Sequence, residues 1–360
     1  MEKLRSDDSR VSLPSIPSAP SSRESSPKSS RKARVRWNGV IPAITTPFNA
    51  DLSVDHGALA DQCRWLADQG VAGVVPLGSL GEGATLTHSE KRQILETCVR
   101  AVSDRVAVLP GIFAISTPEA VALAKHARAV GCRGLMILPP FVYGVDAREI
   151  QTHIAAVLSA TDLRCVFYNN PTAYRTDLLP EQIAVLAHAF PNLEAVRESH
   201  ADVARVPTLR DHLGTRLEVL AGHDETVVES IRAGAVGWIS GLINVFPAES
   251  VALHRYAIAG REGSREFEAL HEWFRPLMHL AQGTKVIQLT KLMLEKVGRG
   301  DARVRPPRLQ LEGESLRDAV AVIDHAIATR PQLQEGARFQ TLAIGHHFKS
   351  DKGEAVGIRL

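Results

Sequence analysis

The sequence predicts an α/β chain folded as a (β/α)8 TIM barrel with a C-terminal helical extension. From Trp37 on, eight short runs rich in β-branched residues alternate with longer stretches of helical period. They recur at roughly 20–35-residue intervals, which suits a barrel of about 250 residues. The rival is an open doubly wound sheet, but its G-x-G-x-x-G pattern is absent after the first run, where residues 44–48 read ITTPF.

The predicted elements follow one another in regular order. Helix starts are indicated by Thr87 with Glu90 three residues later, a capping box, and by Pro118, expected at the first helical position. Glycines are expected to end helices at Gly70, Gly131 and Gly234. After the last strand, helical patterning continues through residue 328. The eight strands are predicted at 40–44, 72–77, 106–110, 134–138, 164–168, 194–197, 217–221 and 236–240.

The pattern divides the chain into four parts. Residues 1–36 contain eleven serines and no periodic apolar pattern, so we expect a disordered Ser/Arg-rich tail. The barrel is predicted over 37–245 and a helical region over 246–330, while 331–360 form a tail without a clear pattern. No apolar stretch of a secretory signal follows the N-terminal charges. An organellar transit peptide stays open, although Asp7, Asp8 and Glu24 count against it.

Composition excludes several classes of protein. No run approaches the roughly 18 apolar residues of a membrane span. Residues 1–36 carry nine Lys/Arg against four Asp/Glu, so the remaining 33 basic and 36 acidic residues give the rest a net charge of −3, which argues against nucleic-acid binding. The four cysteines lie more than thirty residues apart without a C-x-x-C pair, which favours a reducing, cytoplasmic location.

In a (β/α)8 barrel, the carboxyl ends of the strands form the active-site face. The glycine-flanked turn at 78–82 (GSLGE) can direct amides and the Ser79 hydroxyl at an anion such as a carboxylate; an ordinary strand-to-helix turn is the alternative. Tyr168 ends an apolar strand and could carry a proton, or could simply be a buried tyrosine. His223 is a weaker candidate. The substrate-facing residues that we predict are Thr46, Gly78, Leu80, Asn169, Glu198, His223, Ile239 and Ser240.

Taken together, these motifs resemble the dihydrodipicolinate synthase/N-acetylneuraminate lyase superfamily of class I pyruvate-type aldolases. The resemblance runs from about residue 37 to 328, and its carriers are GVIPAITTPF at 39–48, GSLGE at 78–82, YNNP at 168–171 and GWISGLIN at 237–244. The pattern at 169–174 is most similar to a subgroup that deaminates pyrroline-hydroxycarboxylate. The resemblance implies a 2-oxo-acid substrate, a proton-carrying tyrosine at Tyr168, a carboxylate-binding turn at Ser79 and Leu80, and a homo-oligomer (dimer or tetramer).

One departure bears directly on mechanism. The family places an imine-forming lysine on the sixth strand, and the matching position here is Arg197. A guanidinium stays protonated and has no free lone pair, so it cannot form the imine. Other family positions also differ: the second residue of a strand-two Thr pair is Leu80, a tyrosine after strand four falls on Val142 beside Tyr143, and an arginine falls on Ala173 near Arg175.

Three functions remain open from the sequence. The first is a lyase acting on a small 2-oxo acid or related carboxylate without a lysine Schiff base, in which Tyr168, Arg197 and Ser79 are the catalytic residues. The second is a catalytically inactive relative that binds a ligand or regulates. The third is a structural partner of a lysine-bearing paralogue. No convincing metal-ligand set and no dinucleotide fingerprint occur, so we expect neither a metal nor a cofactor.

Overall fold

The computed structural model describes residues 35–142 and 144–333. The chain divides into two compact units, 1–32 and 33–360, and the fold described below belongs to the second. The prediction for 1–34, that for 334–360 and the position of Tyr143 lie outside the described residues. Val35 is described, and it is buried at 5% exposure beside Trp37 in the barrel interior, so ordered structure begins before residue 37.

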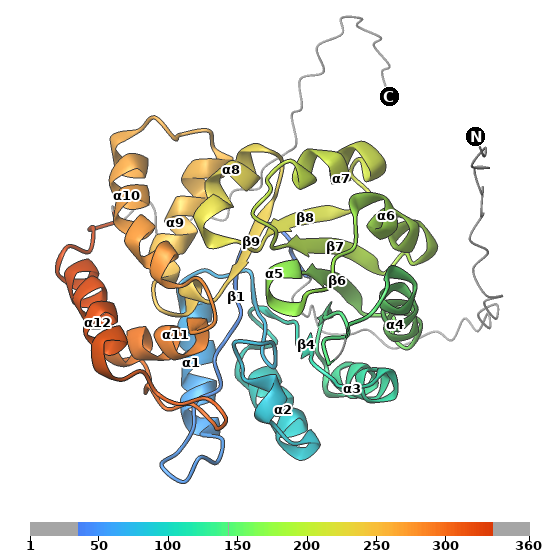
Figure 1. Cartoon of the computed structure of the whole chain (residues 1–360), viewed down its shortest axis with the longest axis horizontal. Helices are drawn as coiled ribbons and strands as arrows, with labels where there is room; N and C mark the ends of the chain where they lie inside the picture. Colours follow the sequence, from blue (N-terminus) through green and yellow to red (C-terminus); the bar gives the residue numbers. More distant parts are fainter. Residues whose placement is uncertain (1–34, 143, 334–360) are drawn as a thin grey trace, which may run out of the picture. The chain divides into compact units, whose positions relative to one another are not determined.

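Parallel strands form the centre of this unit (Figure 1). Hydrogen-bonded neighbours run in the order β1-β9-β8-β7-β6-β5-β4, and β2 pairs with β3. Every pairing between named strands is parallel, as βαβ crossovers require. The strands are β1 (Gly39–Pro42), β2 (Gly73–Val74), β3 (Ala107–Val108), β4 (Gly111–Ile112), β5 (Gly134–Ile137), β6 (Arg164–Asn169), β7 (Leu193–Glu198), β8 (Glu218–Ala221) and β9 (Gly237–Ser240).

Backbone hydrogen bonds outside the named strands close the ring. Ala72 N donates to Val40 O at 2.8 Å and Val75 N to Pro42 O at 2.9 Å, which joins β1 to β2. On the other side, Met136 N donates to Pro110 O at 2.9 Å, which joins β5 to the β3–β4 segment. The predicted closed barrel is thereby confirmed.

The third predicted strand, 106–110, contains β3, and a further strand, β4, follows directly after Pro110. Proline has no N–H to donate, so the ladder is interrupted there. Gly111 N then donates to Pro76 O at 2.8 Å and brings β4 against the turn that follows β2. A Cβ at Gly111 would lie only 2.8 Å from Gly78 Cα, so this close approach of two backbones requires glycine. The break at Pro110 therefore helps to place the 78–82 turn.

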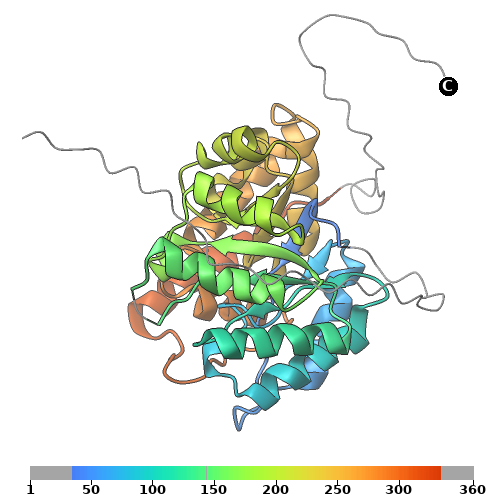
Figure 2. The same ribbon diagram turned by 90° about the vertical axis from the view of Figure 1, so that its right-hand side faces the viewer.

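Helices surround the strands, and each predicted crossover contains one (Figure 1). The predicted Thr87–Glu90 capping box starts α2, and Gly131 ends α3 in the left-handed conformation with φ 97°. After a 90° turn, α2, α3 and α4 (cyan to green) lie side by side outside the strands (Figure 2). These helices are α1 (His56–Asp68), α2 (His88–Val102), α3 (Thr117–Val130), α4 (Ala147–Ser159), α6 (Pro180–Ala189), α7 (Arg205–Leu213), α8 (Val227–Arg232) and α9 (Pro247–Ile258).

The predicted C-terminal helical region, 246–330, contains α9, which packs against β1 of the barrel, and three further helices. They are α10 (Arg265–Leu280), α11 (Val286–Lys296) and α12 (Gly313–Ala328), and they lie together on one side of the barrel in Figure 1. Phe246 and Phe274, both fully buried, meet at 6.4 Å between ring centroids and anchor α10 against the start of α9. No helix within the described residues is both long and apolar enough to cross a bilayer.

Candidate active site

Strand alternation directs the predicted catalytic side chains into the barrel. Val166 and Tyr168 on β6 belong to the interior cluster, whereas Phe167 between them packs outward against the helices. Successive side chains of a strand point to opposite faces, so Arg197, two residues after the interior Ala195, also points inward. Tyr168 and Arg197 are register partners on neighbouring strands. The alternation of side chains along β6 and β7 therefore places Tyr168 and Arg197 side by side.

Arg197 is a buried cation, 7% exposed, held by backbone carbonyls. Its Nε and Nη2 donate to Ile239 O at 3.0 and 2.8 Å, and Nη2 also reaches Gly222 O at 3.3 Å. Its Cζ lies 4.1 Å from the centroid of the Tyr168 ring, a cation–π contact. No acidic side chain pairs with Arg197 in the described part of the chain, and its Nη1 has no hydrogen-bond partner there. A positive charge is therefore fixed in place with one nitrogen uncommitted.

Tyr174 is a functional candidate that the sequence analysis missed. It ends the short helix α5 (Pro171–Tyr174), its hydroxyl is in hydrogen-bond contact with Ser79 Oγ, and its ring meets Tyr168 edge-on at 5.7 Å. Burial and the neighbouring Tyr168 raise the pKa of the Tyr174 phenol well above its usual range, which keeps it protonated. Asn170 Nδ2 donates to Tyr168 Oη at 2.7 Å. A tyrosine shortly after YNNP was the available signal.

The turn at 78–82 was predicted to bind an anion, and two backbone hydrogen bonds define its conformation. Glu82 N donates to Ser79 O at 3.1 Å and Gly83 N to Gly78 O at 3.2 Å, which closes the turn on itself. In the described residues, the amides of Ser79 and Leu80 find no acceptor. The Leu80 side chain packs on Gly241, where a Cβ would lie 2.4 Å from Leu80 Cδ2. Two amides of the turn therefore lack a protein acceptor in the described part of the chain, while the Ser79 hydroxyl contacts Tyr174.

A buried network holds the far end of this turn. Glu82 has φ 54° and no exposed surface, and its Oε1 lies 2.6 Å from Lys291 Nζ of α11. Its Oε2 accepts from Arg305 N at 3.0 Å. Burial lowers the pKa of Lys291, while Glu82 opposes this shift. Residues after the start of α11 therefore clamp the turn, a connection that no local pattern indicates.

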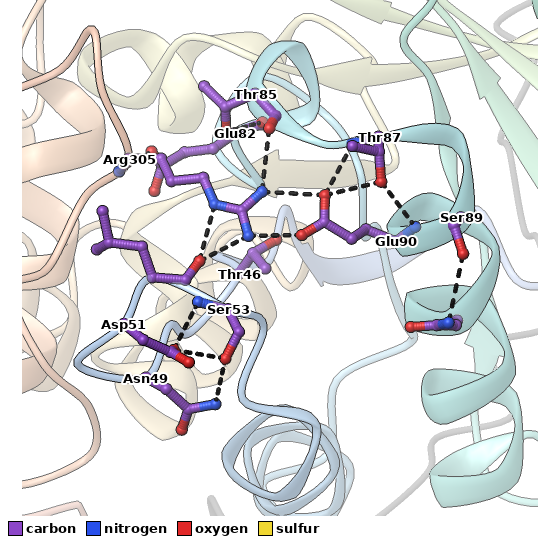
Figure 3. Close-up of polar contacts among 12 residues, drawn as sticks. Thr46, Asn49, Asp51, Ser53, Glu82, Thr85, Thr87, Ser89, Glu90 and Arg305 are labelled. Atoms are coloured by element: carbon purple, nitrogen blue, oxygen red, sulfur yellow. Dashed lines mark hydrogen bonds and ion pairs between the residues drawn. The ribbon is translucent and has the colours of Figure 1, made fainter.

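Arg305 extends the clamp to the loops around it (Figure 3). Its Nη1 donates to Thr85 O at 3.0 Å and its Nη2 to Leu52 O at 2.6 Å. It also forms a two-point ion pair with Glu90, with Nη2–Oε1 at 2.6 Å and Nη1–Oε2 at 3.1 Å. Hydrogen bonding to Arg305 lowers the pKa of Glu90 from 4.5 to about 2.

Several predicted site residues have their polar atoms engaged by protein groups. Asn169 Nδ2 donates to Asp177, Leu178 O and Glu198, and its Oδ1 accepts from Leu178 N, so the side chain ties down the loop after β6. Glu198 also accepts from His200 N, and burial raises the pKa of its carboxyl. Thr46 Oγ1 donates to Gly81 O at 2.7 Å and thereby holds the 78–82 turn.

The ends of β8 and β9 form a second polar group. Asp224 accepts from Ser240 Oγ at 2.8 Å and from Trp238 Nε1 at 2.9 Å, and burial raises the pKa of its carboxyl. His223 is partly buried, and its Nδ1 finds no partner among the described residues. A Cβ at Gly222 would lie 1.9 Å from Ser199 Oγ, so β7 and β8 approach closely here. Of the predicted site residues at the ends of β8 and β9, His223 is therefore the one with a polar atom, Nδ1, that lacks a partner among the described residues.

Lysines stand apart from the strands. Those in residues 35–142 and 144–333 are Lys91, Lys125, Lys285, Lys291 and Lys296, and each lies in a helix or at its N-cap. Lys91 Nζ is bound to Phe113 O at 2.9 Å and Glu119 at 3.2 Å. Over the same ranges, no group of three His, Cys, Asp or Glu residues could hold a metal ion.

The closed parallel barrel with polar side chains gathered at the strand ends defines a (β/α)8 protein with an enzyme-type site. The chain belongs to the dihydrodipicolinate synthetase family, whose sequence model matches residues 36–326. It is 32% identical over 290 residues to a 4-hydroxy-tetrahydrodipicolinate synthase of Chelativorans sp. (strain BNC1), covering 81% of this chain and 98% of that one. A Methanocaldococcus jannaschii enzyme of the same name is 31% identical and covers 77% and 94%.

Solved structures agree with this assignment. The 4-hydroxy-tetrahydrodipicolinate synthase from Methylacidiphilum fumariolicum SolV superposes with a TM-score of 0.78 at 25% identity, covering 82% of this chain and 97% of that one. Chloride-inhibited dihydrodipicolinate synthase from Acinetobacter baumannii, complexed with pyruvate, gives a TM-score of 0.74 at 28% identity and covers 80% and 99%. The predicted family is confirmed.

Proposed function

We propose that this chain is a lyase acting on a small 2-oxo acid or a related carboxylate, without a lysine Schiff base. The observation that carries the proposal is the contact chain Ser79–Tyr174–Tyr168–Arg197 at the strand ends. It combines an anion-binding turn, two phenols and one fixed cation. The A. baumannii relative was crystallised with pyruvate, which supports a ligand of this class.

Each residue of the contact chain has a proposed role. The Ser79 hydroxyl and the amides of Ser79 and Leu80 bind the substrate carboxylate. Arg197 directs Nη1 at the carbonyl oxygen and stabilises negative charge that develops there. Because Nε and Nη2 are already bound to Ile239 O, this contact uses one nitrogen instead of a two-nitrogen grip. Gly222 and Ile239 thereby act as the support of the cation.

Tyr168 is proposed to move the proton. A proton leaves the carbon next to the carbonyl, the electron pair of that C–H bond forms the C=C bond of an enolate, and the carbonyl π pair moves to the oxygen beside Arg197. The Tyr168 oxygen takes up that proton while the phenol's own proton passes to solvent water, and the reverse transfer returns a proton to the carbon; Asn170 Nδ2 donates to the same oxygen and orients it. Tyr174 keeps its own proton and orients Ser79. His223, with its free Nδ1, faces the remainder of the substrate.

The other predicted substrate-facing residues are proposed to shape the pocket. Asn169 and Glu198 fix the loop that carries Asn170. Thr46 holds the carboxylate turn through its bond to Gly81 O, and Gly78 begins that turn in close approach to Gly111. Ser240 fixes the end of β9 next to Ile239 through its bond to Asp224.

Borohydride trapping with pyruvate tests the absence of an imine. Wild-type protein should gain no covalent mass, because the group at 197 cannot form an imine. The Arg197→Lys variant should regain a trappable adduct at residue 197, since lysine can lose its proton in a pocket that lowers its pKa. An adduct on wild-type protein, mapped by peptide mass analysis, would overturn the proposal. Lys291 is the residue to inspect first, because burial already lowers its pKa.

Exchange of the pyruvate methyl protons with deuterated water tests the lyase chemistry without a second substrate. Wild-type protein should catalyse the exchange, and Tyr168→Phe should abolish it while pyruvate still binds, because this variant removes only the hydroxyl and keeps the ring. Pyruvate binding without exchange in wild-type protein would instead favour the inactive ligand-binding alternative, which the lack of strand-borne lysines in the described ranges also favours. If wild-type protein neither binds pyruvate nor catalyses the exchange, the structural-partner alternative is the one that remains.

We also propose a homo-oligomer, dimer or tetramer, located in the cytoplasm. Two large apolar side chains support an interface: Ile115 is 70% exposed and Val142 is 56% exposed. Light scattering at micromolar concentration should give a mass that is a multiple of 39.1 kDa. A monomer would remove this part of the proposal.

A further inference from the structure

A second pocket, of about 620 Å³, lies beside the C-terminal segment. Three elements far apart in the sequence contribute to it: the turn after Glu82, the start of α11 and the segment after Arg305. None of its lining residues belongs to the Ser79–Tyr174–Tyr168–Arg197 chain. The lining residues are Ala84, Thr85, Thr284, Lys285, Gln288, Pro307, Arg308 and Leu309.

The pocket is positively charged without compensation. Lys285 and Arg308 line it, and none of its lining residues is acidic. Within the described ranges, neither cation takes part in an ion pair or a side-chain hydrogen bond, although Arg308 is half-buried. Lys285 is also the N-cap of α11, an eleven-residue helix whose N-terminus has no side-chain cap. The free amides there add a positive end of the helix dipole, so the pocket favours an anion.

Gln288 supplies an independent sign of a ligand. It lines the pocket with 4% of its surface exposed, and its Nε2 donates to Leu309 O at 3.3 Å. Since Leu309 O can only accept, the amide nitrogen must face it, and Oε1 is the atom left over. Oε1 is buried and has no partner among the described residues. A buried acceptor without a donor is costly, so a group that donates a hydrogen bond is expected beside it.

We propose that this pocket binds a small organic anion, a carboxylate that carries a hydroxyl or amino group. The carboxylate pairs with Lys285 and Arg308, and the hydroxyl or amino group donates to Gln288 Oε1. The inference goes beyond the proposed function, because the pocket shares no residue with the proposed catalytic group. The pocket adjoins the carboxylate turn, because its lining residue Thr85 donates its hydroxyl to Glu82 O at 3.0 Å.

Titration calorimetry with L-malate and succinate tests the proposal, because the two dianions differ in a single hydroxyl. We expect malate to bind the wild-type chain about tenfold more tightly than succinate, as one hydrogen bond to a buried acceptor allows. Lys285→Gln and Arg308→Gln should each weaken both ligands about tenfold. Arg148→Gln, which changes an exposed arginine of α4, is the matched control and should change neither.

Gln288→Met provides the decisive comparison. It removes the acceptor with little change of volume, so malate and succinate should then bind equally. If Gln288 only supported the structure, Gln288→Met would bind both ligands more weakly and leave the ratio of their dissociation constants unchanged. Lys285 is exposed, so the Lys285→Gln variant should fold even if Arg308→Gln does not.

Ser79→Ala separates the two sites. Malate binding should persist in this variant, because Ser79 does not line the second pocket. The proposal is overturned if malate gives no binding heat at about tens of millimolar, if binding survives both cation variants, or if Ser79→Ala abolishes it.

Discussion

Replacing Glu90 by Gln isolates the contribution of the Arg305 clamp to stability. Glu90 occupies the third position of α2, where its carboxylate bonds Thr87 N at 2.8 Å and receives two nitrogens of Arg305. The Arg305 and Glu90 side chains are 14% and 23% exposed, so the pair is largely shielded from water. Glutamine preserves the capping box but removes the charge. The variant therefore tests the ion pair without removing the helix start.

The pKa of Glu90 gives the magnitude. It falls from 4.5 to about 2, mainly through hydrogen bonding to Arg305. At about 1.4 kcal/mol per unit the whole shift would correspond to about 3 kcal/mol. Because part of the carboxylate stays hydrated, we expect about 1–2 kcal/mol. Because the pKa of Glu90 is lower in the folded than in the unfolded state, the ion pair stabilises the folded protein fully at pH values above about 4.5. This stabilisation is lost as the pH falls toward 2.

Urea unfolding of wild type and Glu90→Gln between about pH 7 and pH 3 measures this contribution. The difference in unfolding free energy should be constant down to about pH 5 and then shrink. Glu149→Gln is the matched control, because Glu149 is the third residue of α4 in another capping box and has no arginine partner in the described part of the chain. A difference near zero at pH 7, or one that grows on acidification, would refute the reasoning.

Four further outcomes are expected. Tyr174→Phe should weaken pyruvate binding, measured by calorimetry, because Ser79 loses its phenol partner; unchanged affinity would make Tyr174 a packing residue. Gly237→Ala should lower the melting temperature strongly or prevent folding, since its Cβ would lie 2.2 Å from Trp37 O; a wild-type melting curve would contradict this. Burial lowers the pKa of His254 to about 4, so folding favours its neutral form. Acidification from about pH 6.5 to 4 should therefore lower the wild-type free energy of unfolding, measured in urea, by up to about 3 kcal/mol more than that of His254→Asn. Deleting residues 1–34 should leave the melting temperature unchanged, whereas a deletion through Val35 should lower it, because Val35 is buried.

Much of the fold follows from local patterns in the sequence. Alternation places Tyr168 and Arg197 on the same face of adjacent strands, and helix caps such as Thr87 fix where elements begin. The break at Pro110 could also have been predicted from the sequence, because proline has no N–H to donate to a neighbouring strand. A period of two or of 3.6 residues is a property of neighbouring residues, so a sequence displays it directly.

The barrel, the family and the position of the turn at 78–82 follow from the sequence alone. Tertiary contacts settle which polar atoms are engaged: among the described residues Arg197 Nη1 has no partner, whereas every polar atom of the Asn169 side chain is engaged. They also decide that Lys291 and Arg305 clamp Glu82 from more than two hundred residues away. Such contacts depend on how separate helices and loops pack around the barrel, and packing geometry leaves no periodic trace in the chain.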